Sequence, residues 1–118
     1  MTSSDPARFL PLTDLAFNIL VSLSGQAVHG YALIKELRGR SGRAGLRTGT
    51  VYASLARLTD EGLVEEVERP DPEDDARRRY YRATTLGVAT AQAEARRLAE
   101  VLELARARQL IPGATNES

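Results

Sequence analysis

The chain has 118 residues, of which 42% are hydrophobic and 27% are charged, and its formal net charge is zero. This length allows one domain with a modest core, and no apolar run reaches the roughly 18 residues of a spanning helix, so we expect a cytoplasmic protein without a signal peptide or membrane segment. Because the chain has no cysteine and only one histidine, we expect no disulfide, structural zinc site or iron–sulfur cluster, and since nothing in the sequence argues for a metal site built from carboxylates alone, we expect no metal or cofactor.

The first predicted elements are an arm and two helices. Residues 1–9 predict a flexible N-terminal arm. Apolar residues then recur at steps of three and four over residues 12–23, which predicts an amphipathic helix with Pro11 near its start. A second, shorter helix is predicted over residues 30–38. We expect His29 to lie at the start of this helix, because no second histidine or cysteine is available to form a metal site with it.

A third helix and a hairpin follow a glycine-rich basic loop. The helix is predicted to begin at Thr48, which can act either as its N-cap or as a phosphate contact, and to end before Gly62, where a left-handed residue is favoured. Residues 63–68 predict a strand, and Arg-Pro-Asp-Pro turns the chain out of it. Residues 78–83 predict the returning strand.

The last predicted element is a long helix over residues 85–111, capped by Thr84 or Thr85, with a disordered tail at residues 112–118. Its apolar residues alternate at steps of three and four, as in a coiled-coil seam. A single domain of this size leaves little else for such a seam to bury against, so we interpret the helix as a dimerisation element. The predicted interface residues are Val88, Ala91, Ala95, Leu98, Val101, Leu102 and Ala105.

This order of elements predicts a mainly α fold with a two-stranded β-hairpin. It is the layout of a winged helix-turn-helix domain, here residues 10–84, followed by the long helix. In that layout the third helix enters the major groove of DNA. Its exposed N-terminal residues are small or hydroxylated, which lets the helix approach the base edges, and its free N–H groups favour phosphate.

Charge is segregated along the chain although it sums to zero. Residues 37–59 hold five arginines and no acid, residues 60–75 hold nine acids and one arginine, and four arginines follow within residues 77–82. Such segregation can present a basic face to a polyanion, and scattered surface charge is the alternative. The arginines at 77–79 either neutralise the hairpin acids or bind the DNA backbone. The acidic tip itself suits either suppression of nonspecific DNA binding or suppression of wing-to-wing association.

Three segments resemble the signature of PadR-type transcriptional regulators: HGYALIKEL at 29–37, TGTVYASLARLTDEGLVEE at 48–66 and RRRYYRATTLG at 77–87. The resemblance covers roughly residues 10–105. It implies a winged-helix dimer that binds operator DNA, usually as a repressor, and often releases it on binding a small molecule. It is to the short branch of the family, with one helix after the wing. The acidic insertion RPDPEDDA and the absence of tryptophan depart from the pattern.

We therefore predict a dimeric, sequence-specific regulator of transcription that binds double-stranded DNA at a pseudo-palindromic operator, with a small-molecule effector as a further partner. The alternative is a winged helix that binds another protein, which the acidic wing favours and the arginine-rich segment opposes. An enzyme is disfavoured, because no nucleophile–base pair, phosphate-binding loop or metal cluster is visible. The sequence of this chain does not identify the operator or the effector, or whether transcription is repressed or activated. The predicted DNA-binding residues are Thr48, Gly49, Thr50, Tyr52, Ser54, Arg57, Arg77, Arg78 and Arg79.

Overall fold

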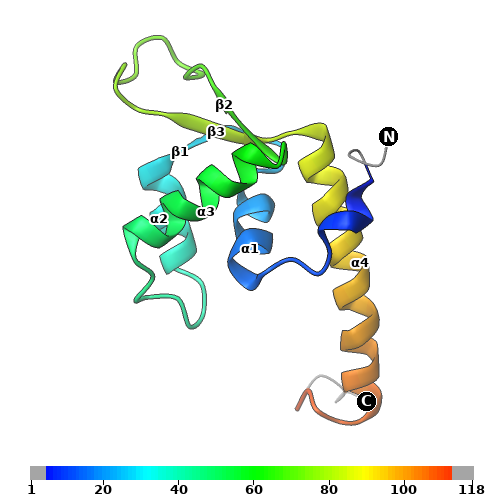
Figure 1. Ribbon diagram of the computed structural model, residues 1–118. Helices are drawn as coiled ribbons and strands as arrows, with labels where there is room; N and C mark the ends of the chain where they lie inside the picture. Colours follow the sequence, from blue (N-terminus) through cyan, green and yellow to red (C-terminus); the bar gives the residue numbers. More distant parts are fainter. Residues whose placement is uncertain (1–4, 113–118) are drawn as a thin grey trace.

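The computed structural model describes residues 5–112, which form a three-helix core, a small sheet and a long helix that projects from them (Figure 1). No helix in this part of the chain is long and apolar enough to cross a membrane. The elements, in chain order, are the 3-10 helix η2 (Pro6–Phe9), α1 (Asp14–Leu23), β1 (Val28–His29), α2 (Gly30–Arg38), α3 (Thr48–Asp60), β2 (Val64–Val67), β3 (Tyr80–Ala83) and α4 (Thr85–Ala107).

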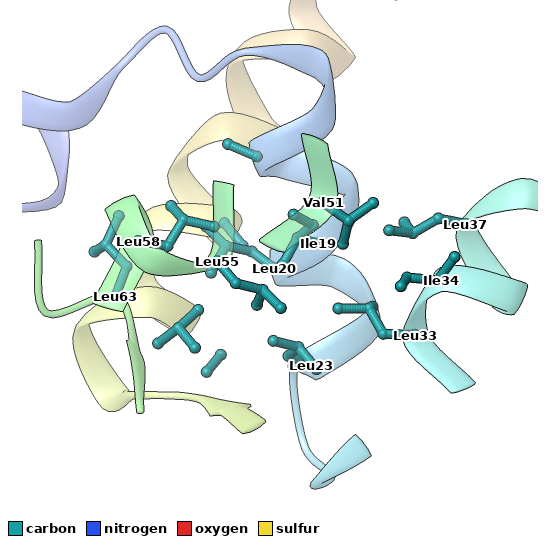
Figure 2. Close-up of a cluster of buried hydrophobic side chains, with 14 residues drawn as sticks. Ile19, Leu20, Leu23, Leu33, Ile34, Leu37, Val51, Leu55, Leu58 and Leu63 are labelled. Carbon is teal, nitrogen blue, oxygen red and sulfur yellow. The ribbon is translucent and has the colours of Figure 1, made fainter. Parts of the chain in front are cut away.

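The core lies where α1 meets α2 and α3 (Figure 2). Each helix contributes residues at steps of three or four, so one apolar face of each turns inward. Their side chains are almost fully removed from water, and each such burial stabilises the fold by about 1.5–3 kcal/mol. The residues at this junction are Ile19, Leu20 and Leu23 of α1, Leu33, Ile34 and Leu37 of α2, and Val51, Leu55 and Leu58 of α3.

The end of α3 confirms the predicted glycine turn. Gly62 has a φ of 80°, in the left-handed region that favours glycine. Its N–H donates to the Thr59 carbonyl at 3.0 Å, and the Leu63 N–H donates to the Leu58 carbonyl at 2.9 Å, which together form a Schellman motif. The turn buries Leu63 and directs the chain into β2, so the helix passes into the wing without a loop.

The sheet has three antiparallel strands in the order β1-β3-β2, one more than the predicted hairpin. The extra strand pairs Val28 with Tyr81 and His29 with Tyr80. Two residues are too few to show an alternating pattern, so the sequence carried no signal for this strand. Its position leads directly into α2, where His29 Nδ1 accepts a hydrogen bond from the Ala32 N–H at 3.2 Å, as expected for a residue at the helix start.

The start of α4 is bonded to the end of α3. The Thr84 hydroxyl caps α4 by accepting from the Gly87 N–H at 3.0 Å, and it donates to the Gly62 carbonyl at 2.6 Å. The Thr84 N–H donates to the Leu63 carbonyl at 3.0 Å. A Cβ at Gly87 would lie only 2.0 Å from that same carbonyl oxygen, so glycine is required for this close approach. Thr84 and Gly87 thus explain the end of the RRRYYRATTLG motif physically.

Both ends of the chain differ from expectation. Residues 6–9, predicted as part of a flexible arm, form η2, which Asp5 caps by accepting from the Ala7 N–H at 3.0 Å, and η2 packs on α4. The long helix ends at Ala107, where Gln109 adopts a φ of 63°, a few residues before the predicted boundary. The predicted disorder of residues 113–118, and of the arm before residue 5, lies outside the described residues.

Candidate nucleic-acid interface

The N-terminal turn of α3 is exposed, as a DNA-reading helix requires. Thr48, Gly49 and Thr50 all lie at the surface there. The predicted cap is wrong, however, since Arg47 is the N-cap residue and has no side-chain capping bond, which makes Thr48 the first helical residue. The Thr48 hydroxyl instead accepts a hydrogen bond from Arg38 Nη2 at 3.3 Å, which ties α3 to the preceding helix.

The other predicted residues of α3 do not share one face. Tyr52 and Ser54 are two positions apart, or about 200° around the helix. Tyr52 is 41% exposed on the side of α2 and the wing, whereas Ser54 is half-buried on the opposite flank, beside a pocket of about 630 Å³ that Phe9 and Leu12 also line. Arg57 lies on the Ser54 side and lines the same pocket.

The face between these flanks consists of small residues, of which Gly49 was among the predicted DNA-binding residues. Gly49, Ala53 and Ala56 are all exposed along the outer side of α3. Their spacing of three and four places them on one stripe, opposite the buried Val51 and Leu55. A count of helical positions from the core outward would have found this stripe. Its small side chains leave the backbone of α3 open to close approach.

A second feature is a pocket of about 530 Å³ where the start of α2, the middle of α3 and the wing meet, which we call the tyrosine–arginine pocket. Tyr52 forms part of its wall, and its hydroxyl packs so closely on Gly30 that a Cβ there would lie 2.3 Å away. Tyr31, which was not predicted as a site residue, is 64% exposed, with the Lys35 ammonium 5.6 Å from its ring centre. The lining residues are His29, Gly30, Tyr31, Tyr52, Arg77, Arg78, Arg79 and Tyr81.

The structure therefore brings Tyr52 together with the three wing arginines, as a shared interface requires. Each arginine is also paired with a carboxylate of the wing, which was the alternative assignment. Arg77 Nε lies 3.1 Å from Asp75 Oδ1, Arg78 Nη1 lies 3.1 Å from Asp74 Oδ1, and Arg79 Nη1 lies 3.2 Å from Glu66 Oε2. All three arginines are exposed, and such pairs contribute only about 0–1 kcal/mol, so phosphate can compete for them.

The tip of the wing is anchored to the sheet by Asp74. The buried Tyr80 donates a hydrogen bond from its hydroxyl to Asp74 Oδ2, and its ring makes an edge contact with His29 at a centroid distance of 5.4 Å. This hydrogen bond is the main reason that the pKa of Asp74 lies below its usual value and that the pKa of Tyr80 lies above its own. The pKa of Asp75 is also lowered, chiefly by the hydrogen bond from Arg77. Both carboxyls are therefore charged at neutral pH.

The arginine-rich segment before α3 presents less free charge than its sequence suggests. Arg40 donates to Asn18 Oδ1 at 3.0 Å and to Ser22 Oγ at 2.7 Å, and it forms an ion pair with Glu36 at 2.9 Å. Arg43 pairs with an aspartate at the start of α1, and Arg38 donates to the Leu46 carbonyl. Three of the five arginines thus hold α1, α2 and their loop together. Within residues 5–112, no side-chain partner is found for the remaining two, Arg47 and Arg57.

The predicted dimer seam divides into two parts. Ala91 is buried in the chain's own core, and Val88 is partly buried against that core. From residue 95 onward the seam is accessible, with Val101 51% and Leu102 47% exposed. Together with Phe17 of α1 it lines an apolar groove of about 500 Å³. The groove residues are Phe17, Ala95, Leu98, Ala99, Val101, Leu102 and Ala105.

A buried carboxylate marks the boundary between these parts. Glu94 is only 1% exposed, and its Oε2 accepts from the Leu12 N–H at 3.1 Å. Arg97 donates to both carboxylate oxygens, at 2.6 and 3.0 Å, and these bonds are the main cause of a lowered pKa of Glu94. Sequence reasoning missed this residue, because a glutamate in an alanine- and arginine-rich helix looks like surface. In the part of the chain that the structure describes, no group of three or more His, Asp or Glu side chains could hold a metal ion.

A family model described as the transcriptional regulator PadR-like family matches residues 19–93. A PadR family transcription regulator from hypervirulent Clostridium difficile R20291 has a similar structure, with a TM-score of 0.72 and 22% identity, over 82% of this chain and 99% of that chain. RosR of H. salinarum is 30% identical, with a TM-score of 0.61, over 80% of this chain and 78% of its own.

A third similar structure contains DNA. A cysteine-to-serine mutant of MarR from E. coli, complexed with operator DNA, has a TM-score of 0.57 and 22% identity, over 77% of this chain and 59% of its own. No curated protein sequence matches this chain significantly. The solved structures at this level of identity support the fold.

Proposed function

Because the chain belongs to the PadR-like family of transcriptional regulators, we propose that it acts as a homodimeric repressor that binds a pseudo-palindromic operator. Regulators of this family bind DNA and are not enzymes, which makes the chain a DNA-binding regulator of transcription. Repression, the dimer and the operator are the finer parts of the proposal. The observation that carries it is the exposed small-residue stripe of α3, flanked by the tyrosine–arginine pocket.

In the proposed complex the stripe of α3 enters the major groove. Gly49, Ala53 and Ala56 let the helix approach closely, and the groove of about 12 Å just admits an α-helix. Thr50 reads base edges, and Tyr52 contacts a phosphate or sugar. Threonine discriminates bases less strongly than a bidentate arginine or asparagine does, so operator choice depends on DNA shape and half-site spacing as well.

The wing arginines hold the DNA backbone beside the helix. Arg77, Arg78 and Arg79 lie in the same pocket as Tyr52, which supports one continuous track of phosphate contacts. Arg57, on the other flank of α3, can bind the opposite edge of the groove. Ser54 is half-buried on that flank, so we assign it a packing role and not a base contact.

A second copy of the chain is the proposed occupant of the apolar groove beside α4. The C-terminal half of α4 projects away from the three-helix core (Figure 1), and its apolar residues are left exposed there. A helix of 23 residues is about 34 Å long, which suits the pairing of two domains on successive turns of DNA. The groove adjoins Phe17 of α1, so the partner's α4 would pack against both helices.

The same groove is where we place a small-molecule effector. Its lining is apolar, and part of its volume of about 500 Å³ would lie between the two long helices of a dimer. A ligand there would change the spacing of those helices and so the spacing of the two α3 helices. A dimer structure with a solid core at residues 95–105 would count against this part of the proposal.

The proposal is tested by fluorescence-anisotropy titration of a labelled duplex from upstream of the chain's own gene, with a scrambled duplex of equal length, at two salt concentrations. Preference for the native duplex and a steep loss of affinity with salt are expected, since phosphate contacts release counterions. Arg78→Ala should weaken binding to both duplexes, whereas Thr50→Ala should weaken only the preferred one. If neither duplex binds at low salt, the protein-interaction alternative is favoured.

A further inference from the structure

The wing is unusual for an element that meets DNA, because its own charge is negative. Residues 64–83 contain seven acidic residues and five arginines, a net charge of −2. The helix α3 adds one arginine and one aspartate and so does not change that balance. Attraction to the phosphate backbone therefore cannot come from the net charge of the elements that face it. It depends instead on individual arginines and on the free N–H groups at the start of α3, so what those arginines bind in the free protein affects DNA binding.

Four arginines of the wing are held by carboxylates of the wing in the free chain. Arg79 bonds both oxygens of Glu66 at 3.2 and 3.3 Å, and Arg77 bonds both oxygens of Asp75 at 3.1 Å. Asp74 forms an ion pair with Arg78 and also accepts a hydrogen bond from the Tyr80 hydroxyl. Arg82 pairs with Glu65 at 2.9 Å. Three of these arginines line the tyrosine–arginine pocket, where the proposed phosphate contacts lie.

We propose that Glu66 and Asp75 are affinity-limiting residues, which occupy the phosphate-binding arginines until DNA displaces them. The inference rests on the proposed DNA-binding function. A carboxylate presents two oxygens to a guanidinium in the same geometry as a phosphate, so each acid is an internal competitor for the DNA backbone. DNA phosphates can displace these carboxylates, because exposed ion pairs of this kind are individually weak.

Breaking an internal ion pair costs the same free energy with either kind of DNA, but the two kinds of DNA differ in what else binds them. Binding to nonspecific DNA derives essentially all its strength from phosphate contacts, so breaking an internal ion pair removes a large part of its gain. Binding to the operator also gains from base contacts and DNA shape through α3, and can therefore offset the same loss. The paired acids thus lower both affinities by the same factor, which leaves bulk DNA weakly bound while the operator keeps the affinity that base contacts and DNA shape supply. An acidic wing of this kind limits binding to bulk DNA and is compatible with binding to the operator.

The test compares Glu66→Gln and Asp75→Asn with Glu73→Gln. All three substitutions remove one negative charge from the wing, but the Glu73 side chain forms no ion pair within residues 5–112. The three variants and the wild-type protein are titrated with the native and scrambled duplexes over a salt series. Each is also eluted from a heparin column, which measures polyanion binding without reference to DNA sequence.

We expect Glu66→Gln and Asp75→Asn to bind the scrambled duplex at least about threefold more tightly than Glu73→Gln does. The slope of log affinity against log salt should steepen by about one for each arginine released. The ratio of native to scrambled affinity should stay unchanged, because both duplexes displace the same carboxylates. Equal gains in all three variants would show that only the general field matters, and this or no gain at all would overturn the inference.

The heparin measurement separates this inference from the function on which it rests. If the wild-type protein shows no preference for native over scrambled DNA, the proposed function fails. Later elution of Glu66→Gln and Asp75→Asn than of Glu73→Gln would still support the masking of the wing arginines. Identical elution of the three variants would overturn the masking as well.

Discussion

The two halves of α4 share one apolar periodicity, but only the N-terminal half buries it within the chain. In the N-terminal half, Val88 and Ala91 pack in the chain's own core beneath α1 and the sheet. In the C-terminal half, Val101 and Leu102 stand half exposed, beyond the reach of that core. The spacing of apolar residues thus identifies which face of a helix is buried, but not against what. What covers the apolar face of α4 depends on how far the chain's own core extends along the helix, and Glu94 is the last buried residue on it.

The largest effect is expected from a charge in the distal half. Leu102→Asp should weaken dimerisation by about 4 kcal/mol, roughly a thousandfold in affinity, because both copies would lose the burial of one leucine. Monomer unfolding should change little, since the residue contacts no core of its own. Sedimentation velocity over a concentration series measures the first quantity. Glu100→Ala, an exposed change nearby, is the control, and a dimer unaffected by Leu102→Asp would contradict the proposed interface.

A substitution at the start of the proximal half should act on the fold itself. Gly87→Ala places a Cβ 2.0 Å from the Leu63 carbonyl oxygen, so α4 must shift away from the α3–β2 turn. We expect a loss of about 3 kcal/mol in the free energy of unfolding, measured by urea titration. Gly45→Ala is the matched control, because a Cβ at that position would meet no atom within 4 Å. Equal stability of the two variants would show that the close approach is not required.

The boundary between the halves is sensitive to Glu94. Glu94→Ala would leave the Leu12 N–H without its partner and Arg97 without its carboxylate, which should lower the free energy of unfolding by about 2 kcal/mol. Glu100→Ala on the same helix should change it by less than about 0.5 kcal/mol. Thermal unfolding followed by circular dichroism compares the two. A loss no larger than that of the control would show that the hydrogen bonds of Glu94 do not stabilise the fold.

The smallest predicted effect is a pH dependence at the same residue. The folded pKa of Glu94 lies below its ordinary value of 4.5, mainly because Arg97 donates hydrogen bonds to the charged form. Its stabilising contribution is therefore complete above pH 4.5 and is lost as the pH falls through the folded pKa. The stability difference between the wild-type protein and Glu94→Gln should be constant from about pH 7 to about pH 5 and shrink below that. A difference that is flat down to about pH 3 would contradict the assignment.

Local features of the fold were predictable because local chemistry determines them. Gly62 ends α3 in the left-handed region and Thr84 caps α4, and both residues are recognisable from their neighbours in the sequence. The stripe of α3 was only partly predicted, because hydroxylated residues were favoured over a consistent helical face. Tyr52 and Ser54 were grouped although they lie on opposite flanks.

Features that depend on long-range contacts were not predictable. Arg40 looked like part of a DNA-facing surface, yet it bonds α1 and α2, because Asn18 and Ser22 come within reach only in the folded chain. Glu94 meets the Leu12 N–H across 82 positions of sequence, and no periodicity signals such a pairing. The acidic and basic residues of the wing could be counted from the sequence. Which arginine pairs with which carboxylate, and hence their proposed competition with phosphate, could be seen only in the structure.

The Thr84 junction makes α4 a lever. One hydroxyl bonds the carbonyl of Gly62 at the end of α3 and the first turn of α4, so the reading helix and the long helix share a joint without an intervening linker. A rotation of only about 10° at that joint would carry the far end of a helix about 34 Å long through roughly 6 Å. In the proposed dimer, a small sliding movement between the two distal helices would conversely tilt α3 by a small angle. In the proposed dimer, substitutions at residues 95–107 would therefore change the spacing of the two α3 helices while leaving the surface of α3 itself unchanged.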